Sequence, residues 1–195
     1  MGIRNLSTAS ISTGAKRSKF WDQTSVYAPS SYESIATATV GSGGSTGVTF
    51  SNIPSTYSHL EIRATTLNAS NFYTIKLRFN GSSSGYNASQ LTSFNATSTS
   101  GGGPDADTGA MIGVGARNAT SYSAISIAKI YEYTKTNLYK RWIATSGTDG
   151  NGTGQTKVTY GYWASTDAIT SIYCYADGST MNEHTTFALY GIKGA

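Results

Sequence analysis

Cysteine and histidine are scarce in this chain of 195 residues, and apolar runs are short. With one cysteine, Cys174, an intrachain disulfide is excluded, and two distant histidines, His59 and His184, cannot complete a zinc site with it. We expect Cys174, in a strand-like stretch, to be buried and inert. No apolar run approaches a membrane span, and the N-terminus lacks the apolar segment of a signal peptide. We therefore expect synthesis in a reducing cytoplasm and no membrane partner.

Charge is scarce as well. Asp, Glu, Lys and Arg make up 12% of the chain, about half of the roughly 25% that is usual for globular proteins. Ser, Thr, Gly and Asn are abundant instead, and aromatic residues reach 12%. This composition indicates a β-sheet protein with a hydroxyl-rich surface. Because few charges and high β-propensity favour aggregation of a free monomer, we expect assembly that covers strand edges.

The net charge of +4 is concentrated in the first 31 residues, which hold four basic residues and one acidic residue. Within residues 16–22 cations and large aromatic side chains lie next to one another, outside any sustained apolar pattern. We predict that residues 1–31 form an extended arm that docks on a partner; a solvated tail is the alternative. Three clustered cations are too few for the basic stripe of a nucleic-acid site. The predicted partner-binding residues are Arg4, Lys16, Arg17, Lys19, Phe20, Trp21, Asp22 and Tyr27.

From residue 32 onward the pattern changes to short, alternating apolar segments between glycine-rich turns. In residues 59–67, for example, Leu60, Ile62 and Ala64 alternate with polar residues, which predicts a strand with one wet face. About ten such strands and no helix predict that residues 32–195 form an all-β domain, an antiparallel β-sandwich resembling a jelly roll. The expected strands are 32–40, 48–53, 59–67, 72–79, 90–96, 111–116, 124–133, 138–145, 157–163, 169–175 and 185–192.

Turn signals separate these strands. We predict hairpin connections at residues 41–47, at Asn80–Gly81 and at residues 149–154. In residues 138–145 apolar side chains occur at both odd and even positions, so the pattern leaves open which way Trp142 faces.

Residues that could carry chemistry are few. Asp105 with Asp107 is the nearest pair of acids for glycoside hydrolysis. Residues 149–154 match the first half of a calcium loop, but Tyr160 stands where the twelfth position needs an acid, so a hairpin turn is preferred. We expect no catalytic site, no cofactor and no metal, and hence a protein that is not an enzyme.

Tyrosines recur along the later strands, where alternation must turn some of them away from any one core. We single out Tyr160, Tyr162 and Trp163 as candidates for a subunit interface or a glycan-contacting surface. A second buried layer is the other interpretation.

Three motifs resemble virion structural proteins of tailed bacteriophages, including many from cyanophages. They are Val48–Arg63 (VTFSNIPSTYSHLEIR), Leu77–Gly81 (LRFNG) and Phe187–Lys193 (FALYGIK). The resemblance covers most of residues 32–195 through short motifs between variable loops. It implies a β-sandwich that forms trimers on a capsid or tail and is anchored by its N-terminus, and it implies no active site.

Two virion locations agree with this resemblance. The leading hypothesis is a capsid decoration (cement) protein, whose arm anchors it to the lattice of the major capsid protein while the sandwich forms a homotrimer outside. The short length favours this hypothesis, since no long shaft is present to reach a host surface. The alternative is a tail-fibre or adaptor protein that contacts a tail or baseplate protein and binds a host-surface glycan or receptor.

Overall fold

The computed structural model describes residues 31–67, 73–95, 98–102, 108–116, 122–149 and 154–193, and these form strands joined by turns and loops, with no helix. In chain order the strands are β1 (Tyr32–Thr39), β2 (Gly47–Phe50), β3 (His59–Thr66), β4 (Thr74–Phe79), β5 (Tyr86–Phe94), β6 (Ser98–Gly102), β7 (Ala110–Val114), β8 (Ala124–Tyr131), β9 (Lys140–Asp149), β10 (Gly154–Trp163), β11 (Ile172–Ala176) and β12 (Thr186–Ile192).

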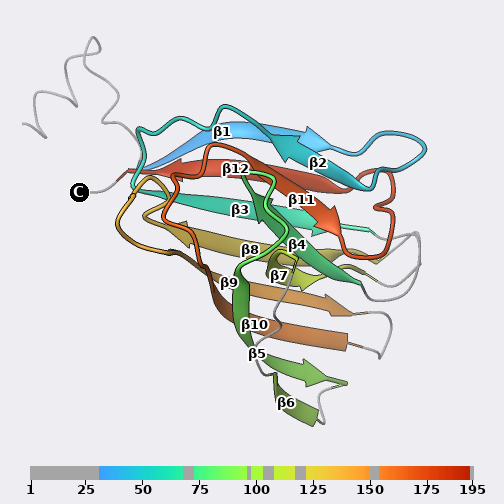
Figure 1. The fold of residues 1–195 in the computed structure, drawn as a ribbon. Helices are drawn as coiled ribbons and strands as arrows, with labels where there is room; N and C mark the ends of the chain where they lie inside the picture. The colour runs from blue at the N-terminus through green and yellow to red at the C-terminus, as the bar shows by residue number, and fades with distance from the viewer. Residues whose placement is uncertain are drawn as a thin grey trace, which may run out of the picture. The chain divides into compact units, whose positions relative to one another are not determined.

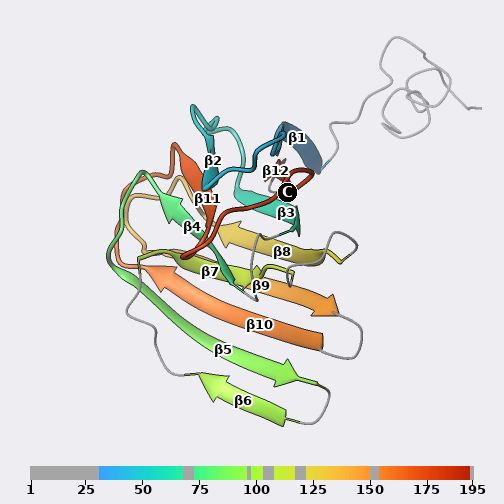
Figure 2. The same ribbon diagram turned by 90° about the vertical axis from the view of Figure 1, so that its right-hand side faces the viewer.

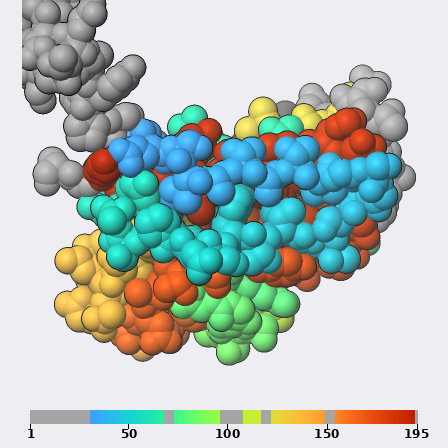
Figure 3. Space-filling view, turned by 90° about the horizontal axis from the view of Figure 1, so that it is seen from above, coloured from blue at the N-terminus to red at the C-terminus, as the bar shows by residue number. Residues whose placement is uncertain are grey.

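The strands form two antiparallel sheets packed face to face (Figure 1). The larger sheet has eight strands in the order β1-β12-β3-β8-β9-β10-β5-β6, and the smaller sheet has four in the order β2-β11-β4-β7. Seen from above, β1 lies along one edge of the sandwich, in blue (Figure 3). The prediction of an all-β antiparallel sandwich is confirmed.

The jelly-roll order is present inside this larger arrangement. When β5, β6, β9 and β10 are set aside, β1-β12-β3-β8 face β2-β11-β4-β7, which is the eight-stranded double sheet of a jelly roll. The four remaining strands are two hairpins, β5–β6 and β9–β10, that extend one sheet only. Figure 2 shows β5 and β6 lying beyond the strands of the smaller sheet.

The core lies between the sheets and follows the alternation in the sequence. Leu60, Ile62 and Ala64 of β3 are buried as predicted, and so are Ile75, Leu77 and Phe79 of β4. Cys174 of β11 is also fully buried, and burial raises the pKa of its thiol. The expectation that this cysteine is buried is confirmed.

An aromatic cluster joins the added hairpins to the core. Phe79 of β4 lies edge-on to Trp142 and Trp163, with ring centroids 6.3 and 5.7 Å away, and Tyr86 stacks on Trp163 at 6.0 Å. The Tyr86 hydroxyl accepts a hydrogen bond from the Phe79 backbone N–H at 2.7 Å, and burial raises the pKa of Tyr86 to about 12. Trp142 therefore faces the core, which the sequence pattern alone did not determine.

Two predicted hairpins are wrong and one is confirmed. The chain does turn at residues 41–47 and at Asn80–Gly81, where Asn80 and Gly81 both have positive φ. At each of these turns, however, it crosses to the other sheet, because β1 and β2, like β4 and β5, belong to different sheets. By contrast, β9 and β10 pair in register from Asp149 opposite Gly154 onward, as a hairpin should.

Candidate interaction face

The eight-stranded sheet has one side that faces away from the smaller sheet, and we call this side the outer face. Along β8, β9 and β10 buried and exposed residues alternate, so every second side chain points to the outer face. The register brings these side chains into rows that cross the strands. In one row Ile127 of β8 lies beside Thr145 of β9, which lies beside Val158 of β10.

Aliphatic side chains are concentrated in this part of the outer face. Leu91 of β5 is paired with Val158 and extends the row, and Ile125 lies two residues from Ile127 on the same strand. Ile125 is 59% exposed and Leu91 is 53% exposed, and Ile127 and Val158 are also exposed. We call Leu91, Ile125, Ile127 and Val158 the aliphatic band. Thr145 lies between Ile127 and Val158 in the row, so the band is apolar on both sides of one threonine. Exposed apolar patches mark interaction sites on proteins.

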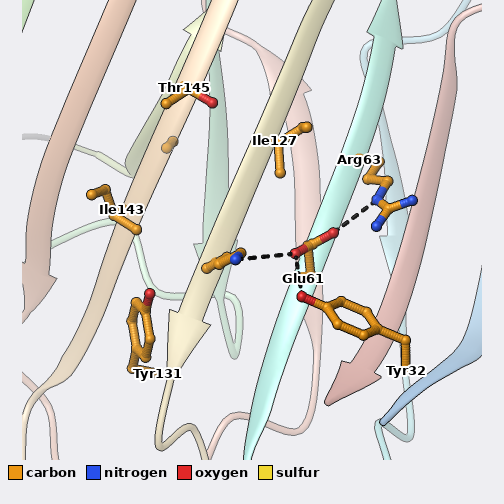
Figure 4. Close-up of a pocket in the computed structure, with 9 residues that line it drawn as sticks. Tyr32, Glu61, Arg63, Ile127, Tyr131, Ile143 and Thr145 are labelled. Atoms are coloured by element: carbon orange, nitrogen blue, oxygen red, sulfur yellow. Dashed lines mark hydrogen bonds and ion pairs between the residues drawn. The ribbon is translucent and has the colours of Figure 1, made fainter. Parts of the chain in front are cut away.

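A buried carboxylate lies next to the band (Figure 4). Glu61 of β3 points to the outer face but is only 2% exposed, because other side chains close over it. The Arg63 Nε donates a hydrogen bond to Glu61 Oε1 at 2.8 Å, and the Tyr32 hydroxyl donates one to Oε2 at 3.3 Å. Lys129 Nζ lies 3.9 Å from Oε2. Two cations thus compensate this buried negative charge, as burial of a charge requires.

The Arg63 side chain is held from both sides. Its guanidinium lies over the Tyr190 ring, 4.8 Å from the centroid, and the hydrogen bond to Glu61 raises the pKa of Arg63. Together with Tyr131, Ile127 and Ile143, this cluster lines a hollow of about 550 Å³. The carboxylate in this hollow already accepts hydrogen bonds from two side chains of the protein.

A second hollow, of about 450 Å³, lies at the end of the outer face next to the loop between β8 and β9. Its main feature is a stacked pair, Tyr139 and Tyr162, with ring centroids 6.0 Å apart and ring planes 9° from parallel. Tyr139 is 54% exposed, and Tyr162 is exposed too. We call this hollow the tyrosine groove; its lining residues are Asn137, Leu138, Tyr139, Arg141, Tyr160, Tyr162 and Thr166.

Arg141 connects the tyrosine groove with the rest of the outer face. It is paired with Tyr162 on one side and Tyr131 on the other. Its Nη2 lies 3.6 Å from Glu132 Oε2, and both side chains are well exposed. Because this separation exceeds a hydrogen bond, the guanidinium keeps donors for a ligand.

Lys140 holds the backbone around the groove. Its side chain points inward and is buried, and its ammonium donates hydrogen bonds to the carbonyl oxygens of Lys135, Leu138 and Thr166. Burial lowers the pKa of Lys140. The three carbonyls belong to the two loops that flank the groove, so one buried cation fixes both.

The sequence-predicted surface aromatics divide into two groups. Tyr160 and Tyr162 lie on the outer face as predicted, 52% and 37% exposed. Trp163 must be removed from this set, because it follows Tyr162 by one residue and therefore faces the core, where its Nε1 donates a hydrogen bond to the Ser84 carbonyl oxygen at 3.2 Å. The predicted arm residues all lie outside the described residues, so the arm stays a prediction.

The other candidate residues have structural partners or lie outside the described ranges. His59 Nδ1 accepts a hydrogen bond from the Glu132 backbone N–H at 3.0 Å, and the His59 ring packs edge-on against Tyr131. Asp105, Asp107 and most of the calcium-like loop fall outside the described residues. Among the residues that are described, no group of three or more His, Cys, Asp or Glu side chains could hold a metal ion.

Sequence reasoning missed the aliphatic band and the burial of Glu61. A signal for the band is present in β8, whose inward positions hold the small residues Ala124, Ser126 and Ala128 while its outward positions hold Ile125 and Ile127. Large aliphatic residues opposite small inward ones indicate a strand that is covered on both sides.

Comparison of the chain with protein-family models, with curated proteins and with solved structures finds no match. In the part of the chain that the structure describes, no helix is long and apolar enough to span a membrane. The resemblance to virion structural proteins therefore rests on the three short motifs alone.

Proposed function

We propose that the protein is a non-enzymatic structural component of a bacteriophage particle, a capsid decoration protein that forms a homotrimer. The observation that carries the proposal is the aliphatic band. Leu91, Ile125, Ile127 and Val158 form an exposed apolar surface on strands that are themselves tied firmly into the sheet. A rigid sheet face with exposed aliphatic residues suits a permanent contact between subunits, whose buried centres are apolar.

Two of the strands that carry the band belong to the added hairpins. Val158 lies on β10 and Leu91 on β5, which extend the jelly roll beyond its eight strands. A jelly roll without these hairpins would lack half of the band. This supports a role of the extension in assembly, because its strands carry Leu91 and Val158 on the outer face.

The partner of the N-terminal arm is a different surface. Among the side chains that the structure describes, the outer face holds the cations Arg63, Lys129 and Arg141 and the acids Glu61 and Glu132, and all five form ion pairs there. The basic arm would gain little attraction from a face with this excess of positive charge. We therefore assign the arm to another protein, the major capsid protein, where its cations pair with acids and Phe20 and Trp21 fill apolar pockets.

Removal of the arm tests this assignment. A chain that starts at Ser31 keeps β1, which begins at Tyr32, so we expect it to fold with an unchanged melting temperature. We expect it to be absent from purified particles, as measured by quantitative mass spectrometry of the virion proteins. The double variant Phe20→Ala/Trp21→Ala should reproduce the loss in the full-length chain, whereas Ser7→Ala/Thr8→Ala, elsewhere in the arm, should not. Normal copy numbers of the truncated chain would contradict the proposal.

The second candidate is a tail component that binds a host-surface glycan, and the tyrosine groove favours it. Electron microscopy of particles labelled on this protein distinguishes the two locations: label over the head supports decoration, and label on the tail supports the second candidate.

A further inference from the structure

We propose that the tyrosine groove is a binding site for a saccharide that carries an acidic group, with its ring stacked on the tyrosine pair and its acid on Arg141. This inference does not depend on the particle location or on the trimer, because it concerns the groove of a single chain.

The stacked tyrosines supply the first part of the argument. Tyr139 comes from the loop before β9 and Tyr162 from β10, and their rings lie within 9° of parallel. Exposed aromatic rings in this arrangement offer an apolar surface edged by hydroxyl groups. A sugar ring has the matching form, since it presents C–H groups on its faces and hydroxyl groups around its edge.

A second stacked tyrosine pair in the same protein differs from the pair in the groove, because one of its rings is covered by a neighbouring side chain. Tyr173 and Tyr175 of β11 stack with centroids 5.3 Å apart and planes 10° from parallel, but Tyr175 is buried. The Arg78 guanidinium covers the Tyr175 ring at 4.7 Å, and its Nε donates a hydrogen bond to the Thr108 carbonyl oxygen at 2.9 Å. That pair is a closed packing unit, whereas Tyr139 and Tyr162 are left open.

The polar groups of the groove supply its selectivity. Asn137, Thr166 and the tyrosine hydroxyls offer hydrogen bonds to sugar hydroxyl groups, and Arg141 is the only charged residue among the residues that line the groove. Its planar guanidinium matches a carboxylate or sulfate with two parallel hydrogen bonds. Because the single lining charge is positive, an acidic saccharide is favoured over a neutral one.

The groove is also preorganised. Lys140 fixes the carbonyl oxygens of Leu138 and Thr166, at 3.0 Å each, so the backbone on both sides of the groove is held before any ligand arrives. Because the groove is already ordered, less conformational entropy is lost when a ligand binds. This matters for sugars, whose individual contacts with proteins are weak.

A printed oligosaccharide array, with neutral members and members carrying uronic acid, sialic acid or sulfate, tests the inference with the purified full-length protein. We expect binding to acidic members, and the strongest of them then serves for titration. Tyr162→Ala and Tyr139→Ala should each weaken that binding about tenfold or more, and Tyr162→Phe should retain most of it because the ring remains. Arg141→Gln should remove the preference for acidic over neutral members.

Tyr173→Ala is the matched control, since it removes one ring of the other stacked pair and should leave sugar binding unchanged. The melting temperature of each variant shows whether it folds. If Tyr162→Ala does not fold, Tyr162→Phe still tests the role of the hydroxyl group and Tyr139→Ala still tests the role of the ring. The inference is overturned if no array member binds, if binding survives both alanine variants, or if neutral members bind as well as acidic ones. It is also overturned if the groove variants abolish self-association and the protein binds no sugar, which would make a second copy the occupant.

Discussion

Gly161 of β10 lies directly opposite Trp142 of β9, and the absence of a side chain there makes room for the indole. A β-carbon on Gly161 would lie 2.3 Å from Trp142 Cζ2 and 2.6 Å from the Asn87 carbonyl oxygen. The indole uses this space to reach across the core, where its Nε1 donates a hydrogen bond to the Met111 carbonyl oxygen at 2.9 Å. One glycine thus allows the added hairpin to dock against β7 of the smaller sheet.

We predict that Gly161→Ala lowers the free energy of unfolding by about 1–3 kcal/mol, because the new methyl group overpacks a buried tryptophan whose surroundings cannot yield. Urea unfolding followed by tryptophan fluorescence measures the change. Gly147→Ala on β9 is the control, since its β-carbon would meet nothing closer than the Gln155 carbonyl oxygen at 3.9 Å. Equal stability of the two variants would show that Trp142 does not depend on Gly161.

The sequence predicted the direction of some side chains and not of others, because contacts between distant residues decide the rest. Alternation correctly placed Leu60, Ile62 and Ala64 inward, but it also placed Glu61 on a wet face. Glu61 is buried because Tyr32, 29 residues earlier, lies over it. The orientation of Trp142 was undetermined because apolar residues occur on both sides of β9, and only the sheet packing decides between them.

At the scale of elements, the Asn80–Gly81 turn shows how one polar side chain directs the chain from one sheet to the other. Asn80 has a φ of 51°, in the left-handed region, and its side chain reaches the loop before β11. Its Nδ2 donates a hydrogen bond to the Ala168 carbonyl oxygen at 2.8 Å, and its Oδ1 accepts one from the Thr170 N–H at 2.9 Å. The turn and the loop therefore form one unit.

We predict that Asn80→Ala destabilises the domain by about 1–3 kcal/mol, through lost hydrogen bonds and the cost of alanine in the left-handed region. Asn80→Gly removes the same hydrogen bonds without the backbone cost, so its loss should be smaller by about 1 kcal/mol. Chemical denaturation of both variants gives the two contributions. If Asn80→Gly matches the wild type, the side-chain hydrogen bonds contribute nothing.

Most strands could be predicted because their apolar residues alternate, and the exceptions lack that signal. β6 (Ser98–Gly102) was missed because it contains only Ser, Thr and Gly. β5 begins at Tyr86, four residues before the predicted start, because Asn87 and Ser89 obscure the alternation. The hairpin predictions at residues 41–47 and Asn80–Gly81 are wrong for the same reason. A turn motif predicts that the chain reverses, but it does not predict which sheet the next strand joins.

At the scale of the whole molecule, the unequal sheets are the feature that creates the outer face. Composition and turn spacing predicted a jelly-roll sandwich, and the inner eight strands have that order. The insertion of β5–β6 and β9–β10 into one sheet was not predicted, because a turn between two strands does not indicate which sheet the second strand joins. The candidate site was therefore only partly predicted: Tyr160 and Tyr162 were found, whereas the aliphatic band needed the register of β8, β9, β10 and β5.

We propose that copies of the chain associate through the aliphatic band. Sedimentation equilibrium of the purified full-length protein measures this association. We expect a trimer, and we expect Ile127→Lys/Val158→Lys to give a folded monomer, since two buried, unpaired charges would be too costly for the interface. Thr49→Lys/Ser51→Lys, at exposed positions in and just after β2 of the smaller sheet, should remain trimeric. A wild-type monomer at all concentrations, or a band variant that stays trimeric, would contradict association through the aliphatic band.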